Sequence, residues 1–269
     1  PLIGHIKKIP TLWNEFWFES NEALHMDLFR RLLGLVLFCC YSIRTLDLKF
    51  FYSESGFLPA SRVNEAIAME GRYSLLLWFS SDTALWVCHI IFLLSLLAMV
   101  FKFFPRIASI IALIMHLSFM HRTMIISYGI DLISVFFLFF QCFADTRVRA
   151  IRGDSNLQKG QDWRSTLGSV AFRLSQIQLC IIYAYGGCHK LKGSHWWSGE
   201  AVWDMMANAQ LTKVDVTWLS HYPSVIILMT FSALIWEIYF PVLVWIKPIK
   251  PYVLLFGVAM HLVILTTAF

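Results

Sequence analysis

Long blocks of apolar residues are the feature of this sequence that most constrains its fold. Blocks of about 20 residues with few charges recur along the 269-residue chain, and that length is what a helix needs to cross a bilayer. Hydrophobic residues make up 58% of the chain and charged residues only 14%, whereas a soluble domain carries about a quarter charged residues. We therefore expect an all-α, polytopic membrane protein, and not a soluble enzyme or a nucleic-acid-binding protein, despite a net charge of +5.

The apolar blocks predict one transmembrane domain, 1–269, with about seven spans, or about eight if the C-terminus is truncated. The first predicted span is marginal because arginines crowd its ends, from which long side chains can reach the interface. The seven predicted spans are Leu28–Leu46, Ala84–Phe104, Arg106–His121, Thr123–Phe143, Ser169–Gly186, Ser224–Ile246 and Pro251–Phe269.

The loops between these spans predict an orientation. Lys and Arg are more frequent on the side that carries the N-terminus, mostly because of the Arg147–Arg164 loop, so the N-terminus is expected to be cytoplasmic. Two loops on the opposite, outer side are too long for simple turns, Asp47–Thr83 and Gly187–Tyr222. Both contain aromatic residues and short amphipathic stretches, so we expect them to lie along the membrane interface and to form any site there.

Two acidic residues lie inside predicted spans, where a charge is costly and usually has a role. Asp131 follows Arg122 closely in sequence, and we expect this arginine to be its counter-ion, as a structural clamp or as part of a site. Glu237 has no charged neighbour in sequence, so it is expected to pair across helices, for example with Arg173, or to stay protonated.

Three histidines, His89, His116 and His261, are embedded in apolar spans. Two facing histidines can ligate haem, but a single histidine on an apolar helix more often forms a packing hydrogen bond. The six cysteines show no spacing typical of zinc and lie in or beside apolar blocks, so we predict no metal site and no disulfide framework.

Lys190 ends the fifth predicted span, directly after a Gly-Gly pair and His189. A lysine in apolar surroundings loses solvation and can serve as a base near neutral pH. The alternative is a terminal lysine that extends to the lipid headgroups.

The residues that follow this lysine carry a family resemblance. The string Lys190-Leu-Lys-Gly193-Ser-His-Trp196-Trp-Ser-Gly199-Glu-Ala201, the sixth-span pattern Glu237-x-x-Phe-Pro241 and a histidine in the last span together resemble the HTTM family. That family comprises the membrane domain of vitamin K-dependent γ-glutamyl carboxylase and short bacterial relatives. Shorter matches, among them Phe29-Arg30-Arg-Leu-Leu-Gly34 and Arg122 with Asp131, extend the resemblance over residues 28–265.

The resemblance implies a role for each of these residues. The carboxylase lysine that matches Lys190 is regarded as the base for oxygenation of vitamin K hydroquinone, on the lumenal side. Lys190 would then be a base, supported by His189 and His261, although the carboxylase has a second lysine where this chain has His189. The residues expected to line and orient the pocket are Glu237, Arg122, Asp131, Trp196 and Gly199.

Two functions from different classes follow. The first is a membrane enzyme that acts at the outer face on a quinone or hydroquinone, or on a secreted peptide. The second is a non-catalytic membrane subunit or a partner in peptide maturation, because the resemblance includes the sporulation-delaying protein B type, which is implicated in maturing a secreted peptide toxin. In both cases the resemblance implies a bacterial inner membrane protein in contact with lipid.

Overall fold

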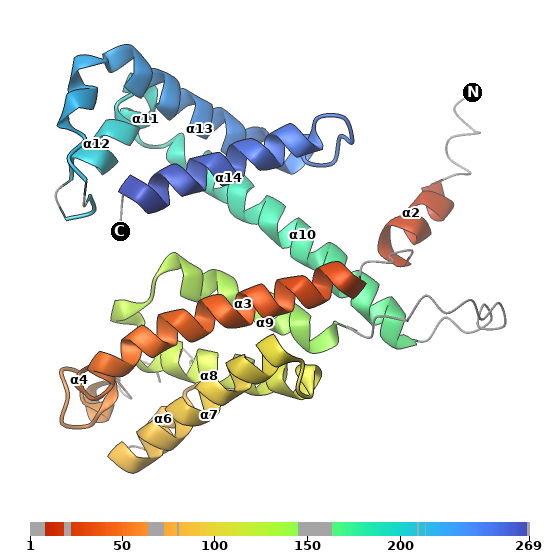
Figure 1. The fold of residues 1–269 in the computed structure, drawn as a ribbon, viewed down its shortest axis with the longest axis vertical. Helices are drawn as coiled ribbons and strands as arrows, with labels where there is room; N and C mark the ends of the chain where they lie inside the picture. The colour runs from red at the N-terminus through yellow and green to blue at the C-terminus, as the bar shows by residue number, and fades with distance from the viewer. Residues whose placement is uncertain are drawn as a thin grey trace. The chain divides into compact units, whose positions relative to one another are not determined.

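A computed structural model describes residues 9–18, 23–63, 73–79, 81–144, 163–208, 210–212 and 214–267. These residues are almost entirely helical, which confirms the predicted all-α class (Figure 1). The chain forms two compact units, Pro1–Ser175 and Gln176–Phe269, and each is described by itself. Most of the Arg147–Arg164 loop, on which the predicted orientation depends, lies outside the described residues.

The first unit is built around four packed helices, α3, α7, α8 and α9, shown in red to green in Figure 1. Its core includes the fully buried side chains of Leu37, Phe92 and Phe119, which come from three different helices. The helices of this unit are α2 (Ile9–Phe18), α3 (Ala23–Arg44), α4 (Leu48–Tyr52), α6 (Leu75–Trp78), α7 (Asp82–Phe101), α8 (Pro105–Arg122), α9 (Gly129–Phe143) and the first part of α10 (Trp163–Lys190).

The second unit contains the rest of α10 and two long helices, α13 (Pro223–Leu243) and α14 (Lys250–Thr267). Pro223 occupies the first turn of α13, where its missing N–H leaves no intrahelical bond unmade. The aromatic side chains of Trp236 and Phe240 form the core between these helices. The short helices of this unit are α11 (Ser194–Ser198), α12 (Ala201–Ala207) and the 3-10 turn η3 (Thr217–His221).

Within the described residues, four helices are long and apolar enough to cross a membrane, against about seven spans predicted from the apolar blocks. The third and fourth predicted spans fall on α8 and α9, but α9 has only 15 residues and α8 carries Arg106, His116, His121 and Arg122. The first predicted span falls on α3, which contains three arginines and an aspartate. The four candidate spans are Asp82–Phe101, Thr166–Lys190, Pro223–Leu243 and Lys250–Thr267.

Candidate functional site

The last residue of α10, Lys190, forms an ion pair with Glu237 of α13: its Nζ donates to Oε1 of the carboxylate. The ammonium also lies 4.8 Å from the ring centroid of Trp196, a cation–π distance. The Lys190 side chain is 30% exposed and that of Glu237 only 11%. The prediction that Glu237 pairs across helices is therefore correct, but its partner is Lys190; the Nε of Arg173 donates instead to the carbonyl of Phe16.

A glycine allows the two helices to meet at this point. A Cβ atom on Gly187 would lie 2.9 Å from Cγ1 and 3.0 Å from the backbone N of Ile238, the residue after Glu237. A Cβ on Gly186 would meet only Glu237 Oε2, at an ordinary 3.6 Å. Position 187 thus requires glycine for close helix packing, and this packing brings the end of α10 beside the carboxylate.

Only one of the two carboxylate oxygens of Glu237 has a hydrogen-bond partner among the described residues. Oε1 accepts from Lys190, whereas the buried Oε2 has no hydrogen-bond partner among the described residues. A buried carboxylate oxygen without a donor is costly, since burial removes its hydrogen bonds to water. This oxygen is the one unsatisfied polar atom of the pair, and it is available to a proton or to a ligand.

The short helix α11 carries Trp196 and is followed by Gly199. Gly199 ends that helix in the left-handed region, with φ at 82°. Its carbonyl accepts a hydrogen bond from Thr230 Oγ1 of α13 at 2.9 Å. Of the two predicted pocket residues, Trp196 therefore lies beside Lys190. Gly199 instead packs against Ile227 and Thr230, about two turns or more of α13 from Glu237.

The two predicted supporting histidines lie elsewhere. His189 is exposed, and its ring stacks against Tyr185 with centroids 6.0 Å apart. His261 of α14 shares a 2.8 Å hydrogen bond between its Nε2 and the hydroxyl of Tyr183. Neither histidine contacts Lys190 within the described part of the chain.

A cleft of about 360 Å³ lies beside this tyrosine–histidine pair. Tyr183, Trp236 and His261 line it, together with aliphatic residues of α10 and α14. Neither Tyr183 nor Trp236 stands out in the sequence, because aromatic residues in apolar helices are usually core residues. The position of Trp236, next to an embedded glutamate, was the available signal.

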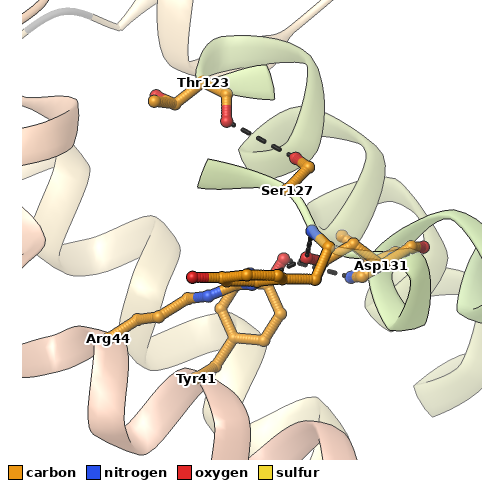
Figure 2. Close-up of polar contacts among 7 residues, drawn as sticks. Tyr41, Arg44, Thr123, Ser127 and Asp131 are labelled. Atoms are coloured by element: carbon orange, nitrogen blue, oxygen red, sulfur yellow. Dashed lines mark hydrogen bonds and ion pairs between the residues drawn. The ribbon is translucent and has the colours of Figure 1, made fainter. Parts of the chain in front are cut away.

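A second ion pair lies in the first unit. Nη1 and Nη2 of Arg44 donate to Oδ1 and Oδ2 of Asp131 at 2.9 and 2.7 Å, as Figure 2 shows. Oδ2 also accepts from the backbone N–H of Tyr128 at 2.8 Å, which caps the start of α9. The Arg44 guanidinium lies 4.7 Å from the ring centroid of Tyr41.

The prediction that Arg122 is the counter-ion of Asp131 is therefore wrong. Nη2 of Arg122 donates to the backbone carbonyls of Tyr52 and Leu58, at 3.2 and 2.7 Å. Burial raises the pKa of Tyr52 to about 12, so this phenol stays neutral beside the arginine. Arg122 holds the segment after α4 in place. Nearness in sequence misled the prediction because the Arg122 guanidinium is directed toward that segment and not toward the start of α9.

Two embedded histidines of the first unit differ in their hydrogen bonds. His89 has one, between Nε2 and Thr45 Oγ1 at 2.8 Å, and its buried Nδ1 has no partner among the described residues. His116 uses Nδ1 with the Tyr41 hydroxyl at 3.2 Å and Nε2 with the Asp131 carbonyl at 2.9 Å. Both ring nitrogens are engaged, which leaves none to ligate haem iron as the haem alternative required. Within the described ranges, no group of three His, Cys, Asp or Glu side chains is placed to hold a metal ion.

Comparisons with protein-family models, curated proteins and solved structures find no match to this chain.

Proposed function

We propose that this protein is an integral membrane enzyme of the vitamin K-dependent carboxylase-like class, and that it acts on a lipophilic, quinone-like molecule. Lys190 and Glu237 are its acid–base couple. The observation that carries the proposal is their ion pair, in which one carboxylate oxygen is buried without a partner and the ammonium is partly exposed. An ionisable pair at the end of an apolar helix is a functional candidate on energetic grounds.

The pair can generate a base when a lipophilic molecule covers it. Removing water disfavours both charged groups, and transfer of a proton from Lys190 to Glu237 converts the pair into a neutral amine and a carboxylic acid. The amine then accepts a proton from a weakly acidic hydroxyl of the bound molecule, such as that of a hydroquinone. The Trp196 ring attracts the ammonium form of Lys190, so it favours the charged group before the proton leaves and after it returns.

The proposal includes the membrane arrangement expected from the sequence. About seven spans, with α3, α8 and α9 among them, and a cytoplasmic N-terminus put the end of α10 at the outer face of a bacterial inner membrane. The apolar character of α9 supports its inclusion, since its 15 residues can span if the bilayer thins or flanking side chains reach the interface.

The direct test is turnover of a reduced naphthoquinone by the purified protein in lipid nanodiscs. With reduced 2-methyl-1,4-naphthoquinone and O₂ as substrates, Lys190→Met is expected to lower the rate of quinone formation above background by about 10²-fold or more. Lys192→Met is the matched control, because Lys192 is exposed two residues away. Equal rates for wild type and Lys190→Met would exclude the acid–base role.

A non-catalytic subunit or peptide-maturation partner is the second candidate function. It is favoured by one observation: Lys190 is engaged by both Glu237 and Trp196, and the residues that line the 360 Å³ cleft do not include it. Purification from native membranes under mild detergent distinguishes the two functions. A stoichiometric complex with another membrane protein, together with wild-type function of Lys190→Met in cells, would favour the subunit.

A further inference from the structure

A polar pair interrupts the apolar surface of the second unit. Tyr183 of α10 and His261 of α14 hydrogen bond to each other at 2.8 Å, and both residues lie within helices long and apolar enough to cross a membrane. His261 is exposed at this position, and neither side chain has a second hydrogen-bond partner in the part of the chain that the structure describes. A polar group that faces hydrocarbon is costly. The Tyr183 hydroxyl and the His261 ring therefore favour an apolar ligand that carries one polar atom.

The space beside the pair has the size and lining of a small-molecule site. Its volume of about 360 Å³ lies in the range of about 300–1,000 Å³ typical of ligand pockets. The rings of Tyr183, Trp236 and Phe240 contact one another along its wall, with centroids 4.6 to 4.9 Å apart. This wall suits a flat ring system, because aromatic rings pack well by offset or edge contacts.

The wall is fixed by a glycine and a hydrogen bond. A Cβ on Gly257 would lie 2.4 Å from the Trp236 ring, so only glycine lets α14 approach this closely. The Trp236 Nε1 donates to the backbone carbonyl of Val253 at 2.9 Å and is therefore already satisfied. The tyrosine–histidine pair is what remains to recognise a polar atom of the occupant.

The chemistry of the pair specifies what that atom must be. If the Tyr183 hydroxyl donates to Nε2, the His261 proton resides on Nδ1 and is left to donate. If Nε2–H donates to the phenol oxygen, the Tyr183 O–H is left to donate instead. Either assignment leaves one neutral donor, which matches a carbonyl oxygen.

We propose that this cleft binds a neutral, membrane-soluble aromatic compound by one carbonyl oxygen, through the donor of the Tyr183–His261 pair. The compound class rests on the proposed function, whereas the cleft and its donor do not depend on it. The inference adds a binding site on α10, α13 and α14 that is separate from the cluster at Lys190.

Binding is measured by equilibrium dialysis of the intact protein in nanodiscs, with empty nanodiscs subtracted. The probes are 2-methyl-1,4-naphthoquinone and 2-methylnaphthalene, which has the same ring shape and no oxygen. The double variant Tyr183→Phe/His261→Phe removes the donor in either assignment and keeps aromatic bulk. It is expected to weaken quinone binding about tenfold and to leave hydrocarbon binding unchanged.

A second pair of variants tests the location. Leu254→Trp fills the cleft, since Leu254 lines it, and is expected to lower binding of both probes. Any quinone that stays bound is then assigned to the cluster at Lys190. Leu255→Trp is the control on the same helix, because Leu255 is 67% exposed and does not line the cleft. Equal binding of the two probes to wild type, or no effect of Leu254→Trp, would overturn the inference.

The same assay separates this inference from the proposed function. Lys190→Met is expected to bind the quinone like wild type. If Lys190→Met loses binding while the cleft variants keep it, the inference is wrong and the proposed function stands. If the cleft variants lose binding but wild type shows no turnover, the inference stands and the proposed function fails.

Discussion

Among the ion pairs of the described residues, Arg44–Asp131 in the first unit and Lys190–Glu237 in the second are built differently. Arg44 contacts both oxygens of Asp131, and a backbone N–H completes the carboxylate, which is 1% exposed. Lys190 contacts one oxygen of Glu237, the other oxygen has no partner among the described residues, and the lysine is 30% exposed. Bidentate arginine pairs fix geometry, whereas a lysine is a point charge on a flexible stem.

The difference indicates different roles. A fully satisfied, buried pair has no atom left for a ligand and serves to hold α3 and α9 in register. A half-satisfied and partly exposed pair gains little stability and keeps an atom available for chemistry. The contrast is consistent with a structural role for Arg44–Asp131 and supports the acid–base role that we propose for Lys190–Glu237.

The largest expected effect on stability belongs to Asp131→Ala. The substitution leaves the partly buried Arg44 guanidinium, 18% exposed, without its counter-ion. Breaking a fully buried pair costs about 3–5 kcal/mol, and we expect a loss near the lower end of this range. Thermal unfolding in detergent, followed by circular dichroism, measures the loss. A decrease below about 1 kcal/mol would remove the structural role of this pair.

Gly187→Ala is expected to rank second. Its Cβ would lie 2.9 Å from Ile238 Cγ1 and 3.0 Å from the Ile238 backbone N, so α10 and α13 must separate at a cost of about 1–3 kcal/mol. Gly186→Ala is the matched control, because its Cβ makes only an ordinary contact. Equal unfolding temperatures for the two variants would contradict the close approach beside the site.

A double-mutant cycle on each ion pair measures the coupling free energy between its two side chains. We expect a coupling free energy below about 1 kcal/mol between Lys190→Met and Glu237→Gln, because the lysine is partly exposed to solvent. The corresponding cycle of Arg44→Met and Asp131→Asn is expected to give a clearly larger coupling. Similar coupling energies in the two cycles would abolish the distinction.

The smallest expected effect is that of Trp196→Phe. Phenylalanine keeps a ring near the Lys190 ammonium but offers a weaker cation–π attraction, and the expected loss is about 0.5 kcal/mol or less. The same thermal unfolding assay, with Trp197→Phe as a neighbouring control, measures it. A loss above about 2 kcal/mol would show that Trp196 is a core residue.

The sequence predicted the residues of the site better than their partners. The cost of a charge in an apolar helix singled out Lys190, Glu237 and Asp131 individually. The pairing of cations with anions depends on how the helices pack. Lys190 and Glu237 lie 47 residues apart in sequence, and Arg44 and Asp131 lie 87 apart. Sequence proximity suggested Arg122 instead, which caps backbone carbonyls.

Other features of the fold were partly accessible from the sequence. Apolar blocks predicted the helices, but length and hydropathy leave four candidate spans in the part of the chain that the structure describes. Tyr183 carried no signal, because a tyrosine in an apolar helix is usual and only its contact with His261 distinguishes it.

The most direct test of the account is Glu237→Gln, with unfolding temperature and quinone turnover measured on the same preparation. Glutamine keeps the shape of the side chain and cannot take up the Lys190 proton. The account predicts a fold stable to within a few degrees of wild type and a rate lowered by about 10²-fold. A variant that is strongly destabilised, or that turns over like wild type, would contradict it.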